Sequence, residues 1–121
     1  MHSLTLVHEV LDNYLLCRAA GQWTRDEAER IIEEIAELAT NQGYDRVLVD
    51  AQKLSAPQME LDRYLAGKHI AMEWHRLKVA IIYSQDQINK FTGNTAVNRG
   101  ALLIVVSEFG DAENWLLNRT G

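Results

Sequence analysis

The sequence predicts one α/β domain with a mixed, mainly parallel sheet and helices packed on it. Three short apolar runs, 46–51, 77–83 and 101–106, do not alternate with polar residues, a pattern typical of strands buried on both faces. Segments with helical periodicity separate these runs. Strands joined through helices must run parallel, because a parallel pair needs a long crossover connection.

The chain begins with a predicted hairpin, the only antiparallel pair that we expect. Two β-type runs, 4–10 and 14–20, flank Leu11-Asp12-Asn13, whose polar residues suit a tight turn. A helix follows over about 25–42. Thr24 and Glu27 have the spacing of a capping box at its start, and Gly43 is placed to end it in the left-handed conformation.

Three further helices complete the order β-β-α-β-α-β-α-β-α, in a single domain over residues 1–121. We expect the first of them at about 57–74, the second at about 85–98 with a point of interruption at Gly93-Asn94, and the last at about 110–118. The last helix should face the core with Ala112, Trp115 and Leu116.

Composition excludes several classes of protein. The chain has 121 residues, of which 47% are hydrophobic and 24% charged, so it can bury a core and is not disordered. Its net charge of −5, with no cluster of Lys and Arg, argues against nucleic-acid binding. Cys17 is the single cysteine, which excludes an intrachain disulfide, and we expect it to be a small buried hydrophobe. No signal peptide or membrane span is apparent, so we expect a cytoplasmic protein.

The element order and five segments of sequence resemble the STAS superfamily, and within it the SpoIIAA-like proteins of bacteria. The segments are RVLVDAQKL (46–54), LDRYLAGKHIA (61–71), KVAII (78–82), NTAVNRGA (94–101) and DAENWL (111–116). The resemblance implies a STAS/SpoIIAA-like fold over the whole chain and a non-enzymatic, protein-binding role. In members that antagonise anti-sigma factors, it also implies a phosphorylated Ser or Thr at the junction after the third strand.

This sequence departs from that pattern at the junction. Counting from Asp50 to the phosphoacceptor position reaches Gln58, Met59, Glu60 and Leu61, none of which has a hydroxyl group. We therefore expect no phosphorylation switch. Ser55 is a weak candidate, because Ser55 and Gln58 fit better as the cap and partner at the start of the helix, with Pro57 in its first turn.

The helix at 57–74 carries two apolar stripes, although packing on a sheet requires only one. Leu61, Leu65 and Met72 share one side, with Tyr64 at its margin, and we expect this side to face the sheet. The opposite side carries Met59, Ala66, Ile70 and Trp74. A neighbouring helix, a second copy of the chain in a homodimer, or a ligand are the three candidates to cover this second stripe.

Polar residues give no recognisable catalytic motif. His69 and Glu73, one turn apart, are placed to pair, and a metal site would need further ligands such as His8 or His75, so we expect no metal and no cofactor. The candidates for a ligand or an unmarked active site lie where open α/β sheets bind ligands. They are Asp50, Asp62, Arg63, His69, Asn98 and Arg99. Asp50, at the predicted strand end, also fits a structural cap.

Three hypotheses about function remain. The first is a non-enzymatic regulatory module that binds a protein partner, or a second copy of itself, through the helix at 57–74. The second is a binder of a small apolar or amphipathic ligand between helices, with Asp62, His69 or Arg99 at its rim. The third, less favoured, is an enzyme without a recognisable motif.

Overall fold

The computed structural model describes residues 3–55, 59–85 and 102–118. Its five strands form one sheet in the order β1-β2-β3-β4-β5. The strands are β1 (Leu4–Val10), β2 (Leu15–Gly21), β3 (Arg46–Leu54), β4 (Lys78–Ile82) and β5 (Leu102–Val106). The β1–β2 hairpin is antiparallel and the other three pairs are parallel, as predicted.

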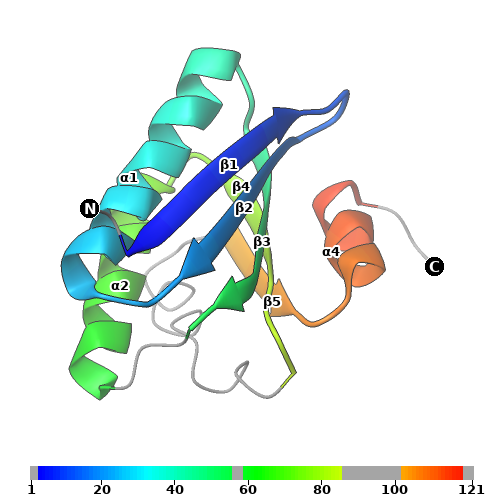
Figure 1. Ribbon diagram of the computed structural model, residues 1–121. Coiled ribbons are helices and arrows are strands. Elements are labelled where there is room, and N and C mark those ends of the chain that lie inside the picture. The colour runs from blue at the N-terminus through cyan, green and yellow to red at the C-terminus, as the bar shows by residue number, and fades with distance from the viewer. Residues whose placement is uncertain (1–2, 56–58, 86–101, 119–121) are drawn as a thin grey trace.

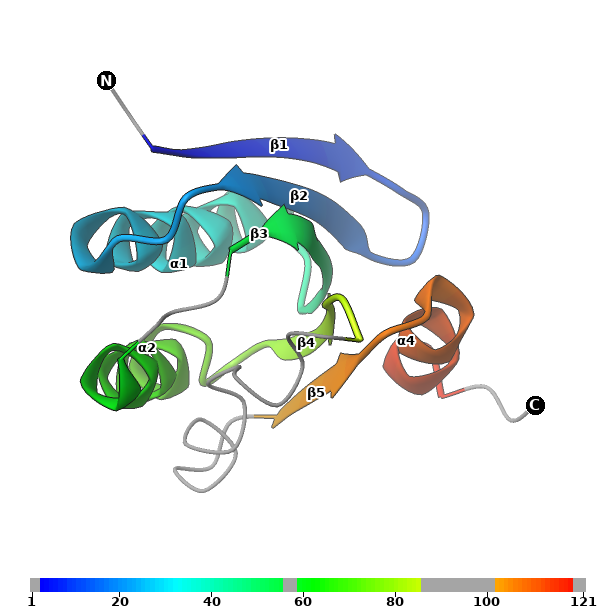
Figure 2. The same cartoon turned by 60° about the horizontal axis from the view of Figure 1, so that its bottom comes forward.

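Helices α1 (Arg25–Gln42) and α2 (Glu60–Glu73) pack together on one face of the sheet, and α4 (Phe109–Leu116) lies on the other (Figures 1 and 2). The predicted order is therefore confirmed over the described residues. The helix predicted at 85–98 lies outside them.

Helix α1 begins and ends at its predicted caps. The Thr24 hydroxyl accepts a hydrogen bond from the Glu27 N–H at 3.3 Å. Gly43 takes the left-handed conformation, with φ at 76°. The Glu27 side chain is used elsewhere, because it accepts hydrogen bonds from the Leu4 N–H and from Arg30. The start of α1 is thereby tied to the edge of the sheet.

Two strand predictions need correction. β3 extends to Leu54, three residues beyond the predicted end, so Asp50 lies within the strand. β5 is an edge strand with Leu102 exposed, whereas its unbroken apolar run predicted burial on both faces. The side chains of β5 other than Leu102 are buried or partly buried, so this edge strand shows the same unbroken apolar run as a central strand.

The sheet separates two hydrophobic clusters. The larger cluster lies between the sheet, α1 and α2, and the smaller one lies between the sheet and α4. Alternation along β2 shows this division, since Leu15 and Cys17 belong to the first cluster and Leu16 to the second. Ala112 and Leu116 of α4 are fully buried, as predicted, while Trp115 is only partly buried. The Lys78 ammonium lies 4.7 Å from the centre of the Trp115 ring.

Candidate functional site

Helix α2 packs with the opposite side to the one predicted. Ala66, Ile70 and Trp74 are only 4%, 2% and 3% exposed, and they belong to the core cluster beneath α1 and α2. The Trp74 Nε1–H donates to the carbonyl of Ile32 on α1 at 2.9 Å. A neighbouring helix and the sheet therefore cover these three residues. Of the predicted free stripe, only Met59 is exposed.

Of the residues predicted to face the sheet, Leu65 is partly buried and the others are exposed. Leu61, Tyr64 and Met72 are 52%, 43% and 59% exposed, and Met59, just before the helix, is 62% exposed. We call Leu61, Tyr64 and Met72 the α2 stripe. Leu61, Tyr64 and Met72 lie along one side of the helix, because at 3.6 residues per turn their directions fall within an arc of about 80°. Because the two sides of α2 are similarly hydrophobic, helical periodicity identifies both of them but does not show which one is buried.

Polar residues of α2 connect it to α1. Asp62 accepts hydrogen bonds from the Arg25 guanidinium at 2.8 and 2.9 Å. His69 Nε2 lies 3.2 Å from a carboxylate oxygen of Glu33 on α1, so its partner is Glu33 and not the predicted Glu73. Arg63 is partly buried on the same helix. Because both pairs join neighbouring helices, Asp62 and His69 have structural partners and do not surround a common cavity.

The junction before α2 differs from the prediction. The helix begins at Glu60, and its N-cap residue is Met59, whose side chain makes no capping hydrogen bond. Ser55, predicted to be the cap, lies five residues before Glu60. Its hydroxyl accepts a hydrogen bond from the Trp23 N–H at 2.7 Å, and its own N–H donates to the Gly21 carbonyl. Ser55 therefore joins the end of β3 to the segment between β2 and α1.

Asp50 supports an irregularity in β3. Between the paired positions Arg18–Asp50 and Ala20–Lys53, β2 has one residue and β3 has two, so β3 contains a bulge. The Asp50 carboxylate accepts a hydrogen bond from the Gln52 N–H at 3.2 Å. Asp50 therefore caps the N–H of Gln52, two residues further along β3, and not an N–H of the following helix.

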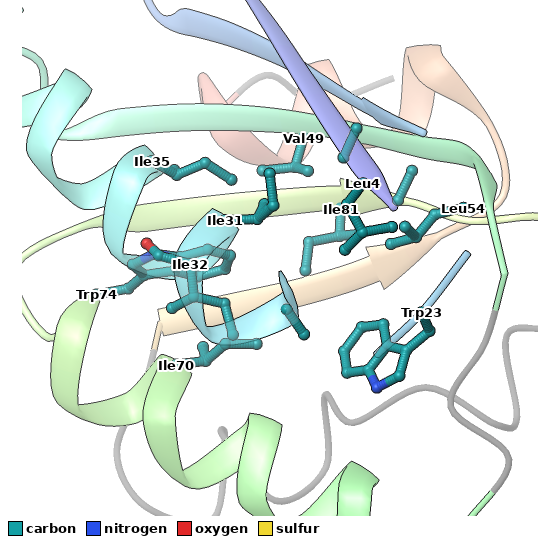
Figure 3. A pocket seen from close by; sticks show the side chains of 13 residues that line it. Leu4, Trp23, Ile31, Ile32, Ile35, Val49, Leu54, Ile70, Trp74 and Ile81 are labelled. Carbon is teal, nitrogen blue, oxygen red and sulfur yellow. The ribbon is translucent and has the colours of Figure 1, made fainter. Parts of the chain in front are cut away.

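An apolar cavity lies between the sheet, α1 and α2 (Figure 3). Figure 3 shows Ile31, Ile32 and Ile35 of α1 facing Val49 and Ile81 of the sheet. The cavity has a volume of about 40 Å³, well below the roughly 150 Å³ of an apolar cavity that accommodates benzene. Ile70 and Trp74 line it, whereas Asp62 and His69 do not. This geometry gives the small-ligand hypothesis no room between the helices.

Titratable groups in the core are held neutral. Burial, with a smaller contribution from Glu34, raises the pKa of the Cys17 thiol from 9.0 to about 12. Burial also raises the pKa of Tyr83. A thiol with so high a pKa is a poor nucleophile and a poor metal ligand at neutral pH. Cys17 therefore has the chemistry of a core residue, as its sequence context predicts.

The described part of the chain contains neither a metal-binding cluster nor a membrane-spanning helix. Over residues 3–55, 59–85 and 102–118, no three His, Cys, Asp or Glu side chains come together to hold a metal ion. None of α1, α2 and α4 is long and apolar enough to cross a membrane. Asn98 and Arg99, two of the predicted ligand candidates, lie outside the described residues.

Solved structures with the same architecture share little sequence with this chain. An anti-sigma factor antagonist from Mycobacterium paratuberculosis aligns with a TM-score of 0.68 at 12% identity, over 95% of each chain. The anti-sigma factor antagonist SpoIIAA in its unphosphorylated form aligns with a TM-score of 0.60 at 11% identity, over 97% of this chain and 100% of that one. The chain has the SpoIIAA-like fold.

A third structure with the SpoIIAA-like fold is an uncharacterized protein of the DUF3478 family from Shewanella loihica. It aligns with a TM-score of 0.56 at 22% identity, over 96% of this chain and 95% of that one. No protein-family model matches this sequence, and a search of curated proteins found no match. The resemblance noted in the sequence is therefore confirmed at the level of the fold.

Proposed function

We propose that this protein is a non-enzymatic regulatory module that binds a protein partner through the α2 stripe. The observation that carries the proposal is the exposure of Leu61, Tyr64 and Met72 on a helix whose other side already supplies its core contacts. An apolar stripe that a helix does not need for packing usually marks an interface. Two solved neighbours with this fold are named anti-sigma factor antagonists, that is, proteins directed at another protein.

Two details of the stripe suit protein recognition. Tyr64 and Met72 belong to residue types that are enriched at interfaces, because Tyr offers a large contact area and Met an adaptable one. The flanking Asp62–Arg25 and His69–Glu33 pairs hold α2 against α1. The stripe is therefore presented on a helix fixed at two points, which lowers the entropy lost when a partner binds.

The proposal does not include regulation by phosphorylation of Ser55. The Ser55 hydroxyl is partly buried and accepts a hydrogen bond from the Trp23 backbone, so adding a phosphate would break that contact. Intact-mass measurement after incubation with a lysate of the host should show no added phosphate on Ser55. Stoichiometric phosphate there would restore the switch that the missing hydroxyl at Gln58–Glu60 argues against.

The test compares two exposed apolar residues on different faces. Met72→Asp places a charge in the stripe, and Val7→Asp places one on β1, where Val7 is equally exposed at 59%. Each variant is used as tagged bait in the host lysate, and bound proteins are quantified by mass spectrometry. We expect a specific partner that wild type and Val7→Asp retain and Met72→Asp loses. With the purified partner, Met72→Asp should weaken binding by about 30-fold, as for an interface hot spot.

Light scattering of the purified chain tests the homodimer version of the proposal. A dimer that Met72→Asp converts to a monomer, while Val7→Asp does not, would identify the partner as a second copy. If all three proteins are monomers and capture the same set of lysate proteins, the α2 stripe is not an interface and the proposal fails.

A further inference from the structure

A second surface lies on the opposite face of the sheet from α2. Leu16 of β2 and Leu48 of β3 are buried under α4, and the next residues on the same side of these strands are Arg18 and Asp50. Arg18 is exposed and Asp50 is partly so. In Figures 1 and 2 the arrowheads of β2 and β3 both lie away from α4. Among the described residues, α4 therefore does not cover the carboxyl ends of these parallel strands on this face.

A hollow of about 150 Å³ occupies this position. Six residues line it: Arg18, Ala19, Ala20, Asp50, Gln52 and Lys53. The bulge in β3 falls within this set, and bulges are common beside binding sites because they redirect side chains. Open α/β sheets also bind ligands at the carboxyl ends of their strands. The volume suits a molecule of about six non-hydrogen atoms, since a cavity of similar size holds benzene.

Cationic and anionic side chains both line the hollow. Arg18 and Lys53 supply two cations. The contact of Arg18 with Glu9, at 3.7 Å, joins two half-exposed side chains and is easily replaced by a stronger one. Asp50 uses Oδ1 to accept the Gln52 N–H, and within the described residues its Oδ2 accepts no hydrogen bond. The hollow therefore offers two cationic donors and one anionic acceptor.

We propose that this hollow binds a small anion that also carries a hydroxyl or amine donor, the chemistry of a hydroxy acid or an amino acid. The anionic end lies between Arg18 and Lys53, and the donor binds the free oxygen of Asp50. Arg and Lys both form charge-assisted hydrogen bonds to carboxylates, and an ionised Asp takes only donors. The site is separate from the α2 stripe, so the proposal does not depend on the proposed protein partner.

The test is a titration of the ¹⁵N-labelled full chain, followed by amide chemical shifts, with glycolate and with acetate. Both probes carry a carboxylate, but only glycolate has a hydroxyl. We expect saturable shifts at residues 18–20 and 50–53, with a millimolar dissociation constant for glycolate, because so few atoms limit the affinity. Acetate should bind about tenfold more weakly, since it lacks the hydrogen bond to a charged acceptor.

Three variants assign the roles. Arg18→Gln should weaken glycolate and acetate alike, by about tenfold. Asp50→Asn, which keeps an oxygen for the Gln52 N–H, should reduce the difference between the two probes. Lys68→Gln, which removes an exposed Lys on α2, is the matched control and should change neither. Shifts that do not saturate, equal affinities for the two probes in wild type, or unchanged binding in Arg18→Gln would each overturn the proposal.

Discussion

Cys17 and Asp50 show how the surroundings of a residue decide what its side chain does. Both carry groups that are reactive in other proteins. Cys17 lies in the core with its thiol neutral, and Asp50 holds the N–H of Gln52 at the bulge. The sequence indicated that Cys17 is buried, from its apolar neighbours. It did not indicate a bulge, because no residue type in 50–53 demands one.

The raised pKa of Cys17 makes stability depend on alkaline pH. Its folded pKa, about 12, lies above the ordinary 9.0, so the thiol ionises first in the unfolded chain. The contribution of Cys17 to the free energy of unfolding is fully present below pH 9. It is lost as the pH rises from 9 toward 12, because over this range only the unfolded chain releases the thiol proton. The free energy of unfolding should fall there by up to about 1.4 kcal/mol per pH unit for this group. Urea titrations of wild type and Cys17→Ala measure it, and an equal slope in both would contradict the assignment.

Asp50 is expected to contribute to stability as a hydrogen-bond acceptor. Asp50→Ala leaves the Gln52 N–H without this partner and should lower the free energy of unfolding by about 1 kcal/mol. Asp50→Asn keeps an oxygen at the same place and should lower it by less than half as much. Urea denaturation at neutral pH measures both values. Equal losses in the two variants would mean that the charge of Asp50, and not its hydrogen bond, stabilises the bulge.

Helix α2 shows that an element with two apolar sides can be located without being oriented. Its position between β3 and β4 follows from the sequence. Its rotation depends on what α1 and the sheet offer. Trp74 finds the Ile32 carbonyl, and Ala66 is small enough to be buried beside α1. The side with Leu61 and Met72 then remains exposed.

The observed orientation makes a direct prediction for two neighbouring positions on α2. Ile70→Ala removes a buried side chain and should destabilise the protein by about 3 kcal/mol. Met72→Ala removes an exposed one and should change stability by no more than about 0.5 kcal/mol. Chemical denaturation of the purified variants gives both numbers. A large loss for Met72→Ala together with a small one for Ile70→Ala would reverse the orientation.

At the scale of the whole molecule, the sheet has two unequal faces. In the described part of the chain, one face carries α1, α2 and the larger core cluster, and the other carries α4, which does not cover the ends of β2 and β3. The two proposed sites lie on different faces, so variants in one should leave the other intact. The core itself holds a small unfilled volume of about 40 Å³ beneath α1.

Filling that volume should stabilise the protein. Val49 lines the cavity, and Val49→Ile adds one methylene group that has space to be buried. We expect a gain of about 0.8 kcal/mol, measured as a rise in Tm of roughly 3 °C. Val47→Ile adds the same group at a buried position that does not line the cavity, and it should destabilise by about 1 kcal/mol or more. If Val49→Ile also destabilises, the cavity is not available to a larger side chain.

The class of fold, the order of the described elements, the parallel pairing and the caps of α1 could all be predicted from the sequence. These features depend on local signals: apolar runs, helical periodicity and the residue types at Thr24 and Gly43. The sequence did not predict which side of α2 is buried, which groups Ser55 and His69 contact, or that Arg18, Asp50 and Lys53 line one hollow. Each of these depends on contacts between residues far apart in the chain, and such contacts leave no periodic trace in the sequence.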